Sequence, residues 1–188
     1  MFNRLTISLC AMVLAVTVLC QAPLYAADIK EAGLATITAM TVTNLHSLAN
    51  SATAGWQSTV VDNTSTLFAD ALVQVVLDFA VTAPANSRAA FLYAYAGLET
   101  TYTNPASGTE GTITLLDITA NAQNLKLVGI IPYTTADEVA ESAVFSVAAA
   151  FGGALPPKWG LALMNHSGSA LAASGNTVKW TGLYHTVN

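Results

Sequence analysis

The chain has 188 residues, of which 53% are hydrophobic and only 9% are charged, and its formal net charge is −5. Since about 25% charged residues is usual for a globular domain, the surface must consist largely of neutral side chains or be covered by copies of the same chain. The six basic residues, set against eleven acidic ones, are scattered along the chain. This excludes the concentrated positive charge that binds nucleic acid, so nucleic acid is not an expected partner.

The first 26 residues have the layout of a secretory signal peptide. Arg4 precedes an uncharged apolar run at 5–19, and the segment QAPLYAA follows it. This order predicts cleavage after Ala26 and export to the periplasm or the extracellular space. The alternative is an uncleaved apolar helical anchor, because about twenty apolar residues can span a bilayer, and only then is a membrane an expected partner. Residues 27–188 are predicted to form a single domain.

Alternation of apolar and polar residues is the main signal in the rest of the chain. It is clearest from Ala69 to Val81, where the β-branched and aromatic content favours a strand over a helix. Further strands are predicted at Leu34–Asn44, Trp56–Val61, Ala89–Ala96, Thr112–Leu116, Leu125–Ile131, Ala143–Phe151, Trp159–Asn165 and Thr177–Val187. About nine strands without an amphipathic helix after the leader predict an all-β, antiparallel β-sandwich, preferably a jelly roll.

The histidines do not form a recognisable catalytic or metal-binding pattern. His46, His166 and His185 are far apart, and none has a second ligand at metal-binding spacing. The sequence contains no GxSxG motif, and the Ser that follows His166 lies in the turn-like segment NHSGSA. Both cysteines, Cys10 and Cys20, lie within the leader, so the remaining chain has no thiol for a disulfide or a metal. We therefore expect the histidines to be surface or strand-end residues.

Acidic residues offer two weak alternatives. Asp137, Glu138 and Glu141 could supply the carboxylate pair of a glycosidase, but their segment TTADEVAES is polar and predicts a solvated loop or a short helical turn. Asp62 and Asn63 could contribute oxygen ligands to calcium, although no EF-hand spacing supports such a site. We expect neither a metal nor a cofactor, and we do not expect an enzyme.

The most unusual stretch is AFGGALPPKWGL, in which two glycines and two prolines separate apolar segments. Pro156 and Pro157 exclude the helix N-terminus that a phosphate-binding loop requires. The stretch is therefore interpreted as a structural motif. Gly152 and Gly153 would supply positive φ angles or a close backbone contact, the prolines would stiffen the crossing, and Trp159 would anchor the next strand between the sheets.

Three blocks together resemble a known family. They are GWQSTVVDNTSTLFADALVQV at 55–75, NLKLVGIIPY at 124–133 and FSVAAAFGGALPPKWGLALMNHSGSAL at 145–171. These blocks are similar to small proteins of tailed bacteriophages and prophages that are regarded as virion structural components. The resemblance extends from about Ala52 to the end and implies a decoration-like protein without catalytic residues. The leader departs from this family, so either the product acts outside the cytoplasm or the leader is an apolar arm used in assembly.

Two functions follow from these features. The first is a non-enzymatic, self-associating β-sandwich of virion type, which binds copies of itself or a capsid lattice. Its expected state is a homo-oligomer, with a trimer as the first expectation, because so few charges leave much neutral surface. The second is a secreted or periplasmic module that binds a glycan or a cell surface through exposed aromatic side chains. The candidates for that role are Tyr93, Tyr95, Tyr102 and Trp180.

Overall fold

The computed structural model of the chain describes residues 29–80, 89–99, 105–114, 124–133 and 139–187. The predicted leader at 1–26 lies outside these residues. The chain divides into two compact units, Glu31–His185 and a terminal unit of Met1–Lys30 with Thr186–Asn188. The architecture below is that of Glu31–His185, and the single domain expected over 27–188 stays a prediction.

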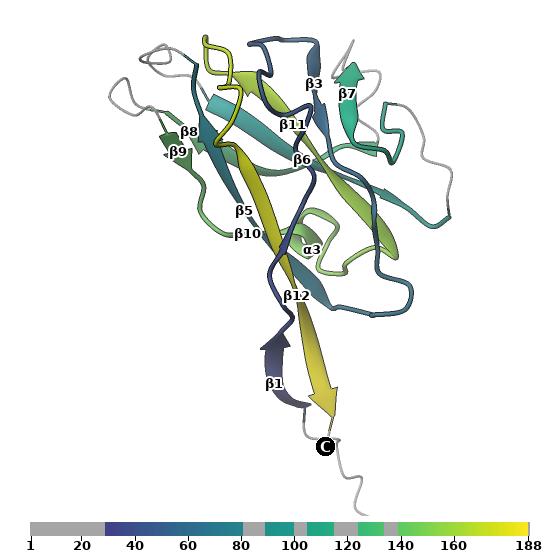
Figure 1. Cartoon of the computed structure of the whole chain (residues 1–188). Coiled ribbons are helices and arrows are strands. Elements are labelled where there is room, and N and C mark those ends of the chain that lie inside the picture. The colour runs from purple at the N-terminus through teal and green to yellow at the C-terminus, as the bar shows by residue number, and fades with distance from the viewer. Residues whose placement is uncertain (1–28, 81–88, 100–104, 115–123, 134–138, 188) are drawn as a thin grey trace, which may run out of the picture. The chain divides into compact units, whose positions relative to one another are not determined.

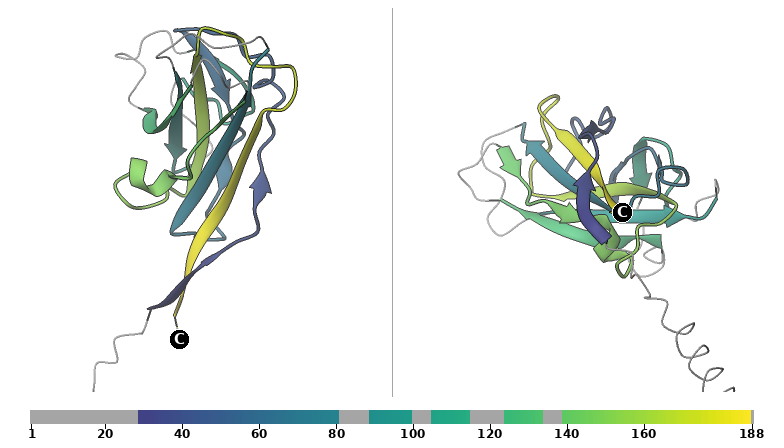
Figure 2. Two further views of the ribbon diagram at one scale, coloured as in Figure 1. Left: turned by 90° about the vertical axis from the view of Figure 1, so that its left-hand side faces the viewer. Right: turned by 90° about the horizontal axis from the view of Figure 1, so that it is seen from below.

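Two six-stranded antiparallel sheets make up the fold and lie face to face (Figure 1, Figure 2). The β5 sheet has the order β1-β12-β5-β10, with β2 beside β12 and β9 beside β5. Its strands are β1 (Ile29–Leu34), β2 (Thr38–Ala39), β5 (Asp70–Asp78), β9 (Val139–Glu141), β10 (Phe145–Ser146) and β12 (Thr177–Val187). The β11 sheet has the order β7-β3-β11-β6-β8, with β4 beside β11. Its strands are β3 (Ala54–Gln57), β4 (Val61–Asp62), β6 (Ala89–Gly97), β7 (Gly111–Thr114), β8 (Lys126–Pro132) and β11 (Lys158–His166).

The order of the strands is that of a jelly roll. Sequence neighbours β1 and β2, β3 and β4, and β9 and β10 each act as one interrupted strand, so each sheet has four main strands. The chain passes between the sheets as in two Greek keys, and β7 is an added edge strand beside β3. The predicted antiparallel β-sandwich is thereby confirmed. The described residues contain twelve strands instead of about nine, because four of them have only two or three residues.

The core between the sheets follows the predicted alternation of β5. Ala71, Val73 and Val75 are fully buried, whereas the residues between them are half-buried on the opposite face. Trp159 and Leu161 of β11 meet this row from the other sheet. A fully buried side chain of valine or leucine size contributes about 1.5–3 kcal/mol by leaving water, so this layer is the main source of stability.

The strand predicted at Leu34–Asn44 is wrong. Strand β1 ends at Leu34, and β2 contains only Thr38 and Ala39, both exposed. Ile37 is also exposed, and only Met40 and Val42 pack against the core, both partly buried. The segment therefore lacks the continuous buried face that would hold a long strand in the sheet. Beyond it, the chain turns and buries Leu45 and Leu48 in the core.

The strand predicted at Ala143–Phe151 is wrong as well, because β10 has two residues and the helical turn α3 (Val147–Ala150) follows it. The Ser146 hydroxyl accepts a hydrogen bond from Ala149 N at 3.0 Å. Asp70 Oδ1 accepts one from Ala148 N at 2.8 Å. Three consecutive alanines have high helix propensity, and these two caps satisfy N–H groups that a single turn leaves free.

Candidate functional site

The two glycines of the unusual stretch end α3. Gly152 and Gly153 have φ angles of +80° and +97°. Gly153 N donates to Ala148 O at 2.9 Å, and Gly152 N donates to Ala149 O at 3.4 Å. This pair of bonds is the Schellman arrangement, which needs a left-handed residue directly after the helix. The predicted positive φ is confirmed, although the glycines follow a helical turn and not a strand.

The rest of the stretch crosses from the β5 sheet to the β11 sheet. Pro157 O accepts a hydrogen bond from Asn63 N at 2.7 Å. Lys158 Nζ lies 3.1 Å from Asp62 Oδ2. Trp159 is fully buried, as predicted, and its indole Nε1 has no hydrogen-bond partner among the residues that the structure describes. These contacts hold a crossing between layers, in agreement with the structural interpretation of the motif.

The histidines occupy three separate places. His46 Nδ1 lies 3.1 Å from Asn176 Nδ2. The His166 ring packs edge-on against Phe91, with ring centroids 5.5 Å apart. His185 is exposed on β12. Within the described ranges, no group of three His, Cys, Asp or Glu side chains is placed so that it could hold a metal ion.

Asp62 and Asn63 use their oxygens within the protein. Asp62 Oδ1 accepts hydrogen bonds from the Thr64 hydroxyl at 2.6 Å and from Thr64 N at 2.9 Å. These bonds, together with Lys158, lower the pKa of Asp62 to about 2. Asn63 is buried, and its Oδ1 accepts a hydrogen bond from Phe68 N at 2.8 Å. The pair therefore organises the loop before β5 and does not form an open calcium site.

The acidic segment is a strand where it is described, so the predicted loop or helical turn is wrong at Val139–Glu141. This segment pairs with β5 because Ala140 is buried between exposed neighbours, a pattern with period two. Gln74 Nε2 donates to Glu141 Oε1 at 2.9 Å. Asp137 and Glu138 lie outside the described residues, so the predicted carboxylate pair of this segment stays a prediction.

A polar cluster that the sequence analysis missed surrounds Glu110. Its Oε1 accepts hydrogen bonds from Asn44 N at 2.7 Å and from Trp56 Nε1 at 2.9 Å, and its Oε2 accepts one from Asn44 Nδ2 at 2.7 Å. Partial burial raises the pKa of this carboxyl, but the hydrogen bonds outweigh burial and hold the pKa below its ordinary value of 4.5. The cluster joins the turn at 42–48 to the start of β7, and no sequence spacing indicates it.

The aromatic residues proposed as a binding platform are largely packed against the protein. Tyr95 is fully buried, and its hydroxyl donates to a main-chain carbonyl 2.8 Å away, so the prediction that it is exposed is wrong. Tyr93 is half-buried, and this burial raises the pKa of its hydroxyl. Trp180 is half-buried and packs edge-on against Trp159, with ring centroids 5.3 Å apart. Tyr102 lies outside the described residues.

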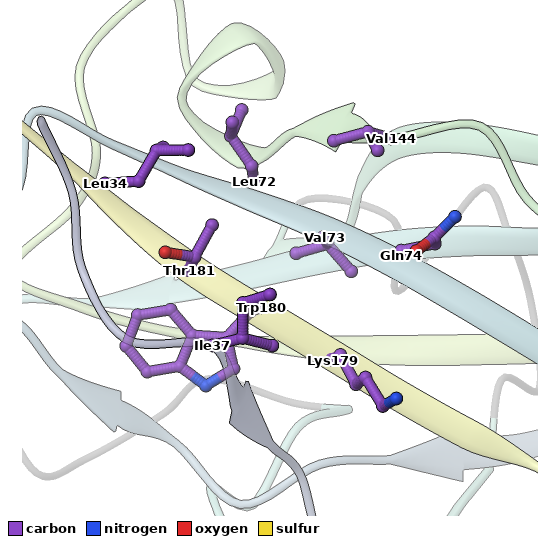
Figure 3. A pocket seen from close by; sticks show the side chains of 9 residues that line it. All are labelled: Leu34, Ile37, Leu72, Val73, Gln74, Val144, Lys179, Trp180 and Thr181. Atoms are coloured by element: carbon purple, nitrogen blue, oxygen red, sulfur yellow. The ribbon is translucent and has the colours of Figure 1, made fainter. Parts of the chain in front are cut away.

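The outer face of the β5 sheet, which points away from the β11 sheet, has an apolar hollow of about 330 Å³. It is lined by Leu34, Ile37, Leu72, Val73, Gln74, Val144, Lys179, Trp180 and Thr181 (Figure 3). Leu34, Ile37 and Val144 are 57%, 68% and 58% exposed. Lys179 is the one charged residue in this lining. The sequence analysis did not find this site, because four separate segments form it.

The outer face of the β11 sheet is covered by the chain itself over β6 and β11, whereas Leu127 and Ile130 of β8 are 50% and 48% exposed. Tyr95 and Met164 point outward from β6 and β11 and are buried. They form a second apolar cluster with Ile113 of β7 and with Ala106 and Leu125, which flank that strand. The two outer faces of the sandwich therefore differ, since the chain covers the centre of one of them and leaves an apolar hollow on the other.

Comparison of the chain with protein-family models, with curated proteins and with solved structures finds no match. Among the helices of the described residues, none is both long enough and apolar enough to cross a membrane.

Proposed function

We propose that this protein is a non-enzymatic structural component of a bacteriophage virion, and that it associates with copies of itself. The observation that carries self-association is the outer face of the β5 sheet, where Leu34, Ile37 and Val144 are each more than half exposed. An exposed apolar patch of this kind marks an interaction surface. The three sequence blocks that resemble virion proteins support the class of assembly.

The polar groups of the described residues favour a structural role over catalysis. A catalytic site needs a nucleophile or an acid and a base within mutual reach, with room for a substrate. Asp62 and Asn63 are engaged in their own loop, and Glu110 is engaged by Asn44 and Trp56. Each of these groups fixes one part of the chain against another. The proposed function requires neither a metal nor a cofactor.

The alternative, a secreted module that binds glycans, has less support. Aromatic platforms for sugars need exposed ring faces, because stacking requires one free side of the ring. Tyr95 is buried, and Trp180 packs against Trp159 and Phe68. Aliphatic residues dominate the exposed apolar surface of the β5 sheet instead, and they suit contact with another protein.

Particle proteomics tests the virion assignment. A strain that carries the gene is induced, tailed particles are purified on a density gradient, and their proteins are identified and quantified by mass spectrometry. We expect the protein to band with the particles in many copies. The intact mass shows whether the chain begins at Ala27, as the predicted export signal requires, or retains residues 1–26 as an assembly arm. A protein that is missing from the particles, and that is a monomer without affinity for capsids or for itself, contradicts the proposal.

A further inference from the structure

The outer face of the β5 sheet has two different halves on either side of β5. The strand order β1-β12-β5-β10 places Leu34, Ile37 and Lys179 on the β12 side. Val144, next to β10, and Glu141 of β9 lie on the other side. Figure 3 shows Leu34 and Val144 on opposite sides of Leu72. Each half therefore offers an exposed aliphatic rim and one charge, and the two charges have opposite signs.

We propose that this face binds the same face of a second copy through a two-fold axis that runs parallel to β5. The inference rests on the self-association in the proposed function and names the surface that performs it. Such an axis places the β12 side of one copy over the β10 side of the other, because it exchanges the two sides of β5. Leu34 and Ile37 then meet Val144 of the partner subunit, and Leu72 of each copy lies near the axis.

The charges of this face are complementary under the same axis. Lys179 lies directly opposite Gln74 in the sheet, and Gln74 Nε2 donates a hydrogen bond to Glu141 Oε1 at 2.9 Å. Since neighbouring strands are about 4.8 Å apart, Lys179 and Glu141 lie about 10 Å apart across the sheet, on opposite sides of β5. Their partners on β5, Gln74 and Val76, place them about 7 Å apart along the strand, which two long side chains can span. The axis brings Lys179 of each copy to Glu141 of the partner subunit, so the pair occurs twice. Complementary charges of this kind set the register and the specificity of an interface.

The net negative charge of the chain limits self-association to surfaces that are locally neutral, and this face is one of them. The chain carries −5, so two copies repel each other except where their surfaces are locally neutral. Between Asp70 and Asp78, at the ends of β5, the described outer face holds one cation, Lys179, and one anion, Glu141. This nearly neutral, apolar strip is the place where two such acidic chains meet with little repulsion.

The size of the face is also that of a dimer contact. Strand β5 has nine residues, which is about 30 Å, and four strands side by side are about 19 Å wide. The product is about 600 Å² of flat area for the whole strand and about 450 Å² for the stretch between Asp70 and Asp78. Both areas are below the roughly 800 Å² of accessible surface that each partner buries in a stable complex, so the contact has the size of a weak dimer. A two-fold contact produces a dimer, so the trimer expected from the sequence would need another surface.

Sedimentation equilibrium tests the surface, using the protein as it is produced from the 188-residue sequence, from submicromolar to tens of micromolar concentrations. Ile37→Asp is expected to raise the dimer Kd about tenfold or more, because it places a charge in an apolar contact twice. The side chain is 68% exposed, so the fold survives, which is checked by circular dichroism and thermal melting. Leu98→Asp is the matched control, since Leu98 is 81% exposed at the end of β6 and is expected to leave Kd unchanged.

A charge exchange tests the two-fold geometry. Lys179→Glu and Glu141→Lys are each expected to raise Kd about tenfold, because each creates two like-charge contacts. The double variant restores opposite charges and is expected to return Kd to within about threefold of the original value. If each single variant raises Kd and the double variant does not lower it again, the proposed two-fold axis is wrong.

The outcomes separate this inference from the proposed function. If the original protein associates but Ile37→Asp and the charge variants change nothing, the surface is wrong and self-association stands. If the original protein is a monomer throughout the concentration range, the proposed self-association and this surface both fail, whereas the virion assignment is decided by particle proteomics. If it is a monomer and Ile37→Asp instead abolishes binding to purified capsids, the face belongs to the capsid lattice, and the two-fold contact is overturned.

Discussion

The two outer faces of the sandwich show two ways of treating neutral surface in a chain with 9% charged residues. On the β11 sheet, Ile113 and the neighbouring Ala106 and Leu125 cover the outward side chains of β6 and β11, which form a second core, and only the β8 side stays partly exposed. On the β5 sheet, Leu34 and Ile37 line an apolar hollow and are exposed. The difference indicates that one sheet is completed within the chain and that the other is available to a partner.

The covered face also has a closer fit between its strands. Tyr95 lies directly opposite Gly160, and a Cβ at position 160 would be 2.3 Å from the tyrosine ring. The ring therefore crosses the neighbouring strand at the one position without a side chain. The Tyr95 ring is therefore fixed against the neighbouring strand and is not free to move to contact a partner. The aliphatic residues of the other face have no comparable constraint.

The largest expected effect of a single substitution on the covered face comes from Tyr95→Ala. Removing a fully buried aromatic ring from a packed site should lower the free energy of unfolding by about 3–5 kcal/mol. Tyr95→Phe removes only the hydroxyl, which donates to Ser58 O at 2.8 Å, and should cost about 1 kcal/mol. Urea unfolding measures both variants. A loss below about 1 kcal/mol for Tyr95→Ala would mean that this face is not a core.

A matched pair compares the two faces directly. Met164→Ala, on the covered face, should cost about 2–5 kcal/mol, because this side chain is 1% exposed. Leu72→Ala, on the uncovered face, should cost about 1 kcal/mol at concentrations where the protein is a monomer, because the side chain is half-buried there. Equal losses in dilute urea titrations would erase the distinction between the faces.

Gly160→Ala sharpens the description of the covered face. The added methyl group forces the Tyr95 ring to move, and overpacking of this kind costs about 1–3 kcal/mol. The double variant Gly160→Ala with Tyr95→Ala should be less destabilised than the sum of the single variants, because the clash disappears. Strict additivity in a double-mutant cycle would show that the ring does not lie over the glycine.

The smallest expected effect is pH-dependent and concerns Glu110, which connects the turn at 42–48 to the start of β7. Its folded-state pKa is lowered, so its stabilising contribution is fully present above pH 4.5 and is lost as the pH falls through the lower folded-state value. Glu110→Gln should cost about 1 kcal/mol near neutral pH, because one carboxylate oxygen is replaced by a donor that faces Asn44 Nδ2. The difference between the two proteins should shrink below pH 4.5. A difference that grows with acid contradicts the assignment.

Much of the fold could be predicted because its long strands bury one face each. The alternation in β5 and the apolar runs of β6 and β11 are visible in the sequence, and the strands are there. The prediction failed at 34–44 and at 143–151, where short segments lack a continuous buried face. At Val147–Ala150, capping by Ser146 and Asp70 decides in favour of a helical turn, and Asp70 is distant in the sequence.

The candidate site was less predictable than the fold. The buried Trp159 and the positive φ angles of the glycines follow from local chemistry. The hollow does not, because Leu34, Ile37, Leu72 and Val144 come from separate segments that only the strand order brings together. Burial of Tyr95 depends on the register that places it opposite a glycine, and periodicity contains no information about register between distant strands.

Hydroxyl-radical footprinting read by mass spectrometry reports both outer faces in one experiment. At every protein concentration, we expect Met164 and Tyr95 to be protected. Ile37 and Val144 should be labelled in dilute samples and protected at concentrations where sedimentation shows association. If Met164 is labelled as readily as the partly buried Met40, the β11 sheet is not covered by its own chain. If Ile37 and Val144 stay equally labelled in an associated sample, the β5 sheet is not covered by a second copy.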